Sequence, residues 1–133
     1  MLLMVIKNKY NAKKITVDGI KFDSKAEAAY YRHLNMLVKA GEVIKFEMQV
    51  PFELQEGFSH PTKRNKSGTP KKVPAMKYVA DFVVRYRDGT EKVIDVKGMQ
   101  TQVFKMKAQM FLKKYGPLYL VKRNGSFWIM EEF

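Results

Sequence analysis

Two carboxylates and a lysine on adjacent predicted strands are the residues of this chain best suited to chemistry. Asp81 interrupts the apolar run 78–84, and Asp95 and Lys97 occur in the run 93–97. Because strand side chains alternate between faces, Asp95 and Lys97 point to the same side of their strand. The turn that joins the two strands decides whether Asp81 faces them.

Two turns are compatible with the residues between these strands. A two-residue loop, Asp88-Gly89, places the two aspartates on opposite faces. A three-residue loop, Arg87-Asp88-Gly89, pairs Asp81 directly with Asp95 and brings their Cβ atoms to within about 5 Å. Like charges that lie opposite one another are destabilising unless a positive group lies between them. In that second geometry a divalent cation is the group that fits.

A third carboxylate comes from a predicted helix. The helix begins near Ser24 and runs to about Lys39, and its apolar stripe, projected back by one turn, leads to Glu27. Ser24 and Glu27 also form a capping-box pattern, which explains the glutamate without catalysis. A structural ion pair of Asp81 with Lys97 is a competing explanation for that aspartate, because a buried carboxylate without a partner is costly.

Oxygen ligands of this kind suit Mg²⁺, with Mn²⁺ as a substitute. The chemistry that they indicate is hydrolysis of a phosphodiester bond, in which the metal polarises the phosphate and lowers the pKa of a bound water. Lys97 would orient that water or stabilise negative charge, and Glu27 would hold a second metal or position a metal-bound water. Gln49, a polar residue on an interior strand, is an auxiliary candidate for contact with water or phosphate. Asp95 alone is also explained as a strand-end cap.

The charge of the chain limits its partners. With 133 residues it forms one domain, and 25 Lys and Arg residues against 13 Asp and Glu residues give a net charge of +12. Most basic small domains bind nucleic acid, and some bind anionic membranes. The absence of cysteine excludes disulfides and thiolate zinc sites and fits a reducing cytosol. No apolar run is long enough to span a bilayer, so we expect no membrane partner.

Basic residues are frequent in two segments that flank the predicted core. Residues 56–75, which are rich in glycine and proline, are predicted to form a basic flexible loop, and such long loops are usually functional or disordered. Residues 1–14 form an N-terminal arm whose apolar start, 1–6, is either an extra strand or a dimer contact. For Lys107, on the second helix, a solvated helix face is the alternative to a phosphate contact. The candidate DNA contacts are Lys13, Lys14, Lys63, Arg64, Lys66, Lys71, Lys72 and Lys107.

The order of predicted elements indicates a mixed fold. A hairpin at 15–22 precedes the first helix, a strand over 43–54 precedes the two acidic strands, and a second helix covers about 101–115. Asn-Gly at 124–125 predicts a C-terminal β-hairpin. We therefore expect an α/β or α+β domain with a mixed central sheet flanked by helices.

These motifs resemble those of the PD-(D/E)xK nuclease superfamily, which has the restriction-endonuclease-like fold. The matching residues are Ala80-Asp81 and Asp95-Val96-Lys97, with Glu27 on the preceding helix. Residues 8–14, 18–27 and 95–101 further resemble small phage and prophage proteins of this superfamily that are linked to recombination. Ala80 stands where the superfamily has a proline, which is not a ligand.

The resemblance implies a Mg²⁺-dependent DNA endonuclease in which Glu27, Asp81, Asp95 and Lys97 are catalytic. It implies that the three carboxylates and the backbone carbonyl of Val96 hold the metal. Its most specific form is a Holliday-junction resolvase that acts as a homodimer on four-way DNA, in the cytoplasm of a bacterial host cell. The alternatives are a sequence-specific or nicking nuclease with the same site, and a non-catalytic nucleic-acid-binding protein whose acids are structural.

Overall fold

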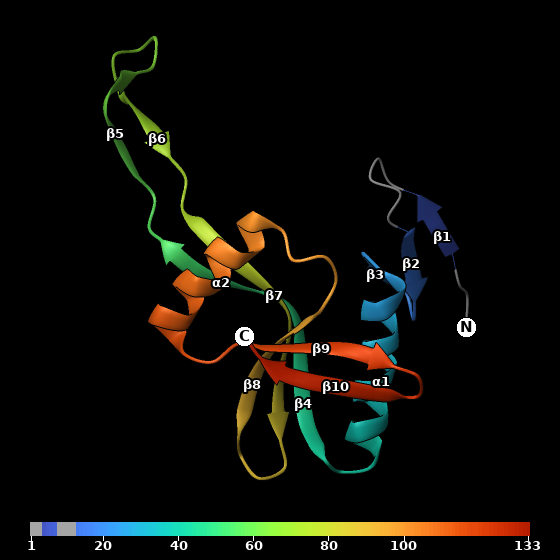
Figure 1. Ribbon diagram of the computed structural model, residues 1–133. Helices are drawn as coiled ribbons and strands as arrows, with labels where there is room; N and C mark the ends of the chain where they lie inside the picture. Colours follow the sequence, from blue (N-terminus) through green and yellow to red (C-terminus); the bar gives the residue numbers. More distant parts are fainter. Residues whose placement is uncertain (1–3, 8–12) are drawn as a thin grey trace.

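The computed structural model describes residues 4–7 and 13–133, and side chains from Lys14 onward; residues 1–3 and 8–12 lie outside the described part (Figure 1). No helix in this part is both long and apolar enough to cross a membrane. Its elements, in chain order, are β1 (Met4–Lys7), β2 (Lys13–Val17), β3 (Ile20–Phe22), α1 (Lys25–Lys39), β4 (Val43–Gln55), β5 (Phe58–Arg64), β6 (Pro70–Val73), β7 (Met76–Tyr86), β8 (Glu91–Val96), α2 (Gln102–Tyr115), β9 (Tyr119–Asn124) and β10 (Phe127–Glu132).

A five-stranded sheet with the order β10-β9-β8-β7-β4 forms the centre of the molecule. The sheet is mixed, because β8 and β9 are parallel whereas the other neighbours are antiparallel. One hydrophobic cluster joins Leu34 of α1 to Phe82 and Ile94 of the sheet. A second cluster joins Phe111 of α2 to Tyr78. The predicted α+β organisation, with helices packed on a mixed sheet, is confirmed.

Both helices begin and end at the residues that their sequences indicate. The Ser24 side chain caps α1, and Gly41, with φ 80°, follows its last turn. The Thr101 side chain caps α2, and Gly116, with φ 105°, ends it. Hydroxyl caps and left-handed glycines satisfy backbone groups that a helix end leaves unpaired. These local signals therefore determine where the two helices stop.

The two predicted short hairpins are both present. Asp18-Gly19 connects β2 to β3, with φ 53° and 76° at the two turn residues. The C-terminal hairpin joins β9 to β10, and its two-residue turn is 125–126 because Asn124 pairs with Phe127. The sequence predicts Asn124-Gly125 as the turn; the turn lies one residue later, so Arg123 pairs with Trp128 and not with Ser126.

The N-terminal segment is only partly described. Residues Met4–Lys7 form β1, which pairs with β2 in a three-stranded sheet β1-β2-β3. This confirms the extra strand for those residues. Lys13 and Lys14 begin β2 and so belong to a strand, not to the predicted N-terminal arm. The dimer contact expected from residues 1–6 is not tested.

The segment predicted as a flexible loop, 56–75, is a β-hairpin. β5 and β6 pair antiparallel and continue the long antiparallel pair β4–β7, so that a ribbon projects from the body of the molecule (Figure 1). We call residues 58–73 the basic hairpin. Most of the glycine and proline residues that indicated a loop lie at its joint and its turn, and Pro61 lies in the irregular part of β5. At the joint, a Cβ at Gly57 would lie 3.0 Å from the carbonyl oxygen of Val73.

Candidate active site

The turn between β7 and β8 decides the relation of the two aspartates. It is the three-residue turn over 87–89, and its glycine has φ 90°. The last paired residues before the strands separate are Phe82 and Ile94, so Asp81 and Asp95 occupy the next position of the register. Paired residues share a face of the sheet. The geometry that places the two aspartates opposite one another is therefore the one that forms.

The strands part where these aspartates lie, and each carboxylate bonds to the backbone of the other strand. Oδ1 of Asp95 accepts a hydrogen bond of 2.7 Å from the backbone N–H of Asp81. Oδ2 of Asp81 accepts one of 2.9 Å from the backbone N–H of Val96. The carboxylates thus replace carbonyl acceptors that the separating strands no longer supply to each other. These bonds hold both side chains at the same end of the sheet.

Gln49 contacts Asp81 from β4, which is an edge strand of the sheet and not an interior one. It lies on β4 directly across from Asp81, between register positions that pair normally. Its Nε2 donates a long hydrogen bond of 3.5 Å to Oδ1 of Asp81. Gln49 has φ 53°, in the left-handed region that a residue with a side chain rarely adopts. Such conformations cost about 1–3 kcal/mol and cluster at functional sites, so the distortion marks this position of the strand.

Glu27 lies in the first turn of α1, close enough to Asp81 for their charges to interact. Its backbone N–H donates to Oγ of Ser24 at 3.1 Å, so the helix cap that the sequence indicated is present. Burial, followed by repulsion from Asp81, raises the pKa of Glu27 to about 8, and Asp23 and Asp95 add smaller repulsions. Glu27 therefore belongs both to the cap region and to the acidic cluster.

The two aspartates also bind protons more tightly than exposed carboxyls do. Burial raises the pKa of Asp95 to about 6, against a hydrogen bond from the backbone of Asp81 that lowers it. Burial also raises the pKa of Asp81, against hydrogen bonds from Val96 and Gln49. Asp95 is 8% exposed. Because the charged forms of all three carboxyls are disfavoured, a bound cation would stabilise this cluster.

Lys97 does not supply that positive charge. Its ammonium group pairs with the carboxylate of Glu131 on β10, and its backbone N–H donates to the carbonyl of Val121 at 2.6 Å. Among the ion pairs of the described residues, none involves Asp81 or Asp95. The structural pair of Asp81 with Lys97, which competed with the metal site, is not formed. No local pattern indicates Glu131, because it lies 34 residues beyond Lys97 in the chain.

A pocket of about 380 Å³ opens beside the aspartates. Asp81, Asp95 and Lys97 line it, together with Lys107 of α2, whereas the fourth predicted site residue, Glu27, is not among its lining residues. Lys107 is half-buried there, so it does not lie on a simply solvated helix face. Lys77 of β7 also lines the pocket and was not anticipated, because lysines are too common in this chain to single one out. Two carboxylates and three ammonium groups around one cavity can accommodate a metal ion and a phosphate.

The donor atoms suit a hard divalent cation but do not form a complete protein cage. In the described part of the chain, no three or more Asp, Glu or His side chains are arranged as a metal site. Mg²⁺ commonly binds through one or two carboxylates and keeps several waters. The backbone N–H of Val96 donates to Oδ2 of Asp81, so Val96 adjoins this carboxylate. The carboxylates of Asp81 and Asp95 fit Mg²⁺, and the carbonyl of Val96 stays a ligand that the resemblance alone implies.

A model of a protein family matches residues 7–128. The chain belongs to the DUF1064 family. The description of that family is "Protein of unknown function", so membership by itself assigns no activity. No curated protein and no solved structure matches the chain. For this DUF1064 protein, the geometry of the site is the main indication of function.

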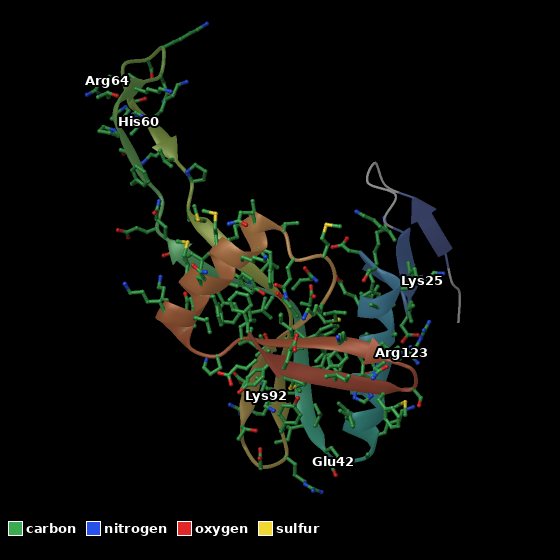
Figure 2. All side chains as sticks on the ribbon, in the orientation of Figure 1. Lys25, Glu42, His60, Arg64, Lys92 and Arg123 are labelled. Atoms are coloured by element: carbon green, nitrogen blue, oxygen red, sulfur yellow. The ribbon has the colours of Figure 1, made fainter. Side chains whose placement is uncertain are left out.

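The remaining candidate DNA contacts of this DUF1064 protein lie away from the pocket. Figure 2 shows Arg64 near the tip of the ribbon, far from Lys25 on α1. Lys14 pairs with Asp23 at 3.8 Å, and the side chain of Lys13 lies outside the described residues. The exposed residues on the basic hairpin are Lys63, Arg64, Lys66, Lys71 and Lys72.

Proposed function

We propose that this protein is a Mg²⁺-dependent DNA endonuclease of the PD-(D/E)xK type, with a restriction-endonuclease-like core. The observation that carries the proposal is the pair Asp81 and Asp95, placed opposite one another at the end of a pocket with no ion-pair partner among the described residues. Such a pair is unfavourable without a cation. Glu27 beside it, and Lys97 directly after β8 at the same pocket, support the same reading.

Each residue of the site has a distinct role in this proposal. Asp81, Asp95 and the carbonyl of Val96 hold the metal, and Glu27 lies beside it. When bound, Mg²⁺ would polarise the scissile phosphate and lower the pKa of a water. Lys97 places a positive charge at the pocket, where negative charge develops on the phosphate. Glu27, beside the metal, can position a metal-bound water for attack on the phosphate.

DNA is the proposed substrate because of the charge of the chain and of the pocket. The net charge is +12, and three ammonium groups line the pocket. The resemblance of the motifs favours four-way DNA, cut by a homodimer, since a symmetric cut of a junction needs two active sites. The same resemblance favours the cytoplasm of a bacterial host as the place of action.

The test is cleavage of a labelled panel that contains a four-way junction, a fork, a linear duplex and a single strand. Each substrate is incubated with Mg²⁺, with Mn²⁺ and with EDTA, and Asp95→Ala serves as the inactive control. We expect paired symmetric nicks in the junction that require metal and are lost in the variant. Cleavage of every substrate would support a general or nicking nuclease with the same site. Cleavage that persists in Asp95→Ala would overturn the site.

A second candidate function is non-catalytic binding of nucleic acid. The observation that favours it is the hydrogen bonding of both aspartates to backbone donors, which gives Asp81 and Asp95 a structural role. In that case Mg²⁺ would leave the melting temperature unchanged and produce no cleavage, although DNA would still bind. A rise in melting temperature with Mg²⁺ that Asp95→Asn abolishes would exclude this candidate.

A further inference from the structure

The basic hairpin, residues 58–73, is the most strongly cationic projection of the molecule. It contains five Lys and Arg residues and no Asp or Glu. All five are exposed, and none takes part in an ion pair among the described residues. A concentration of unpaired cations on one projecting element indicates an anionic partner of corresponding shape.

The tip of the basic hairpin is a formed turn. The backbone N–H of Asn65 donates to the carbonyl of Thr69 at 2.8 Å, and that of Gly68 donates to the carbonyl of Asn65 at 2.9 Å. The side-chain amide of Asn65 donates to Oγ1 of Thr69 at 3.1 Å, and the guanidinium of Arg64 donates to the carbonyl of Gly68 at 3.1 Å. These bonds give the tip a defined shape before any partner binds.

A histidine holds the irregular part of β5 in place. Nδ1 of His60 accepts hydrogen bonds from the backbone N–H groups of Thr62, at 3.1 Å, and Lys63, at 2.9 Å. The register of β5 and β6 shifts between Ser59 and Arg64, and His60 satisfies backbone donors that this shift leaves unpaired. The basic hairpin is therefore a two-stranded ribbon with its own internal bonding.

The ribbon connects directly to the candidate active site. β7 runs from the base of the basic hairpin to Asp81, and it is paired with β4 along this length. Strand residues rise by about 3.3 Å each, so the 13 steps along the ribbon from Gly68 to Asp81 span at most about 43 Å. One turn of B-DNA is about 34–36 Å long, so the ribbon is long enough to reach one helical turn from the aspartates.

The shape and composition of the basic hairpin favour duplex DNA as the partner. Neighbouring strands lie about 4.8 Å apart, and the major groove, about 12 Å wide, admits a two-stranded ribbon. Its single aromatic residue, Phe58, lies at the base, so it offers no platform on which the bases of a single strand could stack. The tip, 65–69, is polar, which does not suit insertion into lipid.

We propose that the basic hairpin enters a groove of duplex DNA and contacts its phosphates about one helical turn from the candidate active site. The position of the cut rests on the proposed function. The hairpin adds to that function a duplex flank of about 10 base pairs as part of the substrate. The hairpin then sets the distance between the grip on the DNA and the scissile phosphate.

The first part of the test measures DNA binding in EDTA, where cleavage plays no part. The hairpin variant is Lys71→Gln/Lys72→Gln, and the control variant is Lys39→Gln/Lys45→Gln. The control carries the same charge change on exposed residues on either side of Glu42, which lies at the end of the molecule opposite the basic hairpin (Figure 2). We expect the hairpin variant to lower the slope of log K against log salt by about 2 and the control by much less, since each phosphate contact contributes about 0.9. Equal slopes in the two variants would overturn the proposal and leave an acidic protein as the partner to consider.

The second part measures distance along the DNA. The chain has no cysteine, so Ser67→Cys at the tip and Met99→Cys at the pocket each provide a single attachment point for an iron chelate that cuts DNA by hydroxyl radicals. We expect the two cutting centres to lie about one helical turn, 10 base pairs, apart. Coincident centres, or cutting from the pocket position alone, would overturn the inference. Because neither readout needs Mg²⁺ or cleavage by the protein, failure of the proposed nuclease activity would remain a separate result.

Discussion

Replacing Asp95 with asparagine is expected to stabilise the metal-free protein while it abolishes cleavage. Asp95 is 8% exposed, and burial raises its pKa from an ordinary 3.8 to about 6. The amide oxygen of asparagine can still accept the hydrogen bond that the backbone N–H of Asp81 donates at 2.7 Å. The substitution therefore removes a disfavoured charge and keeps the acceptor.

The magnitude follows from this pKa. A change from 3.8 to about 6 corresponds to about 3 kcal/mol of folding free energy for Asp95. A hydrogen bond to a charged acceptor is stronger than one to a neutral acceptor by about 1 kcal/mol, so the expected net gain is about 1–2 kcal/mol. Because the folded-state pKa is raised, the wild-type penalty is absent below about pH 4, grows with pH and is complete above about pH 7. The gain should therefore be full at pH 8 and absent at pH 4.

Urea and thermal unfolding in EDTA, at pH 8 and at pH 4, measure this difference. A gain of this size corresponds to a rise of about 5 °C in melting temperature at pH 8. The control is Asp88→Asn, on the turn of the same hairpin, where hydrogen bonds from Thr90 hold the pKa of Asp88 below its ordinary value. The control should gain no stability at pH 8 and should keep its cleavage activity. An Asp95→Asn protein that is less stable than wild type at pH 8, or whose difference does not change with pH, would refute the reasoning.

Three further predictions concern the metal, the lysine and the joint of the ribbon. Millimolar Mg²⁺ should raise the melting temperature of the wild type at pH 8 and raise it less at pH 5, where Asp95, with a pKa of about 6, is protonated; equal shifts would contradict this site. Lys97→Met should reduce kcat about 100-fold or more. Glu131→Gln should change kcat less than about threefold and stability by less than about 1 kcal/mol, since the ion pair of Lys97 with Glu131 is partly exposed. Similar losses of kcat in both variants would show that Glu131 positions Lys97. Gly57→Ala places a Cβ 3.0 Å from a backbone oxygen and should weaken DNA binding in a gel-shift assay, with cleavage of bound DNA kept; unchanged affinity would show that the joint tolerates the change.

Local sequence patterns were sufficient for the ends of the helices and for the short hairpins. Ser24 and Thr101 act on backbone groups three residues away, and Gly41 and Gly116 follow the last turns of their helices. Interactions of this kind depend on residues that are close in sequence, and residue type therefore indicates them. The same reasoning explains why the α+β order of elements was predictable.

The prediction of a flexible loop at 56–75 is wrong because most of its glycine and proline residues form the joint and the turn of a hairpin. Glycine and proline at the joint and the turn indicated a loop, yet β5 and β6 pair as an extension of β4 and β7. The pairing depends on strands that are brought together by the central sheet. A pattern read over a few residues contains no information about such partners.

The sequence by itself determined that Glu27 lies in the first turn of a helix and that Asp95 lies in a strand, because local periodicity and capping residues indicate such elements. The strand ends at Val96, one residue before Lys97. The tertiary structure decided that Asp81 faces Asp95, since both a two-residue and a three-residue turn suited the residues between the strands. It also decided that Lys97 pairs with Glu131, so that neither aspartate has an ion-pair partner within residues 4–7 and 13–133. These relations depend on strand register and on contacts between distant elements, which are set by the packing of the whole sheet.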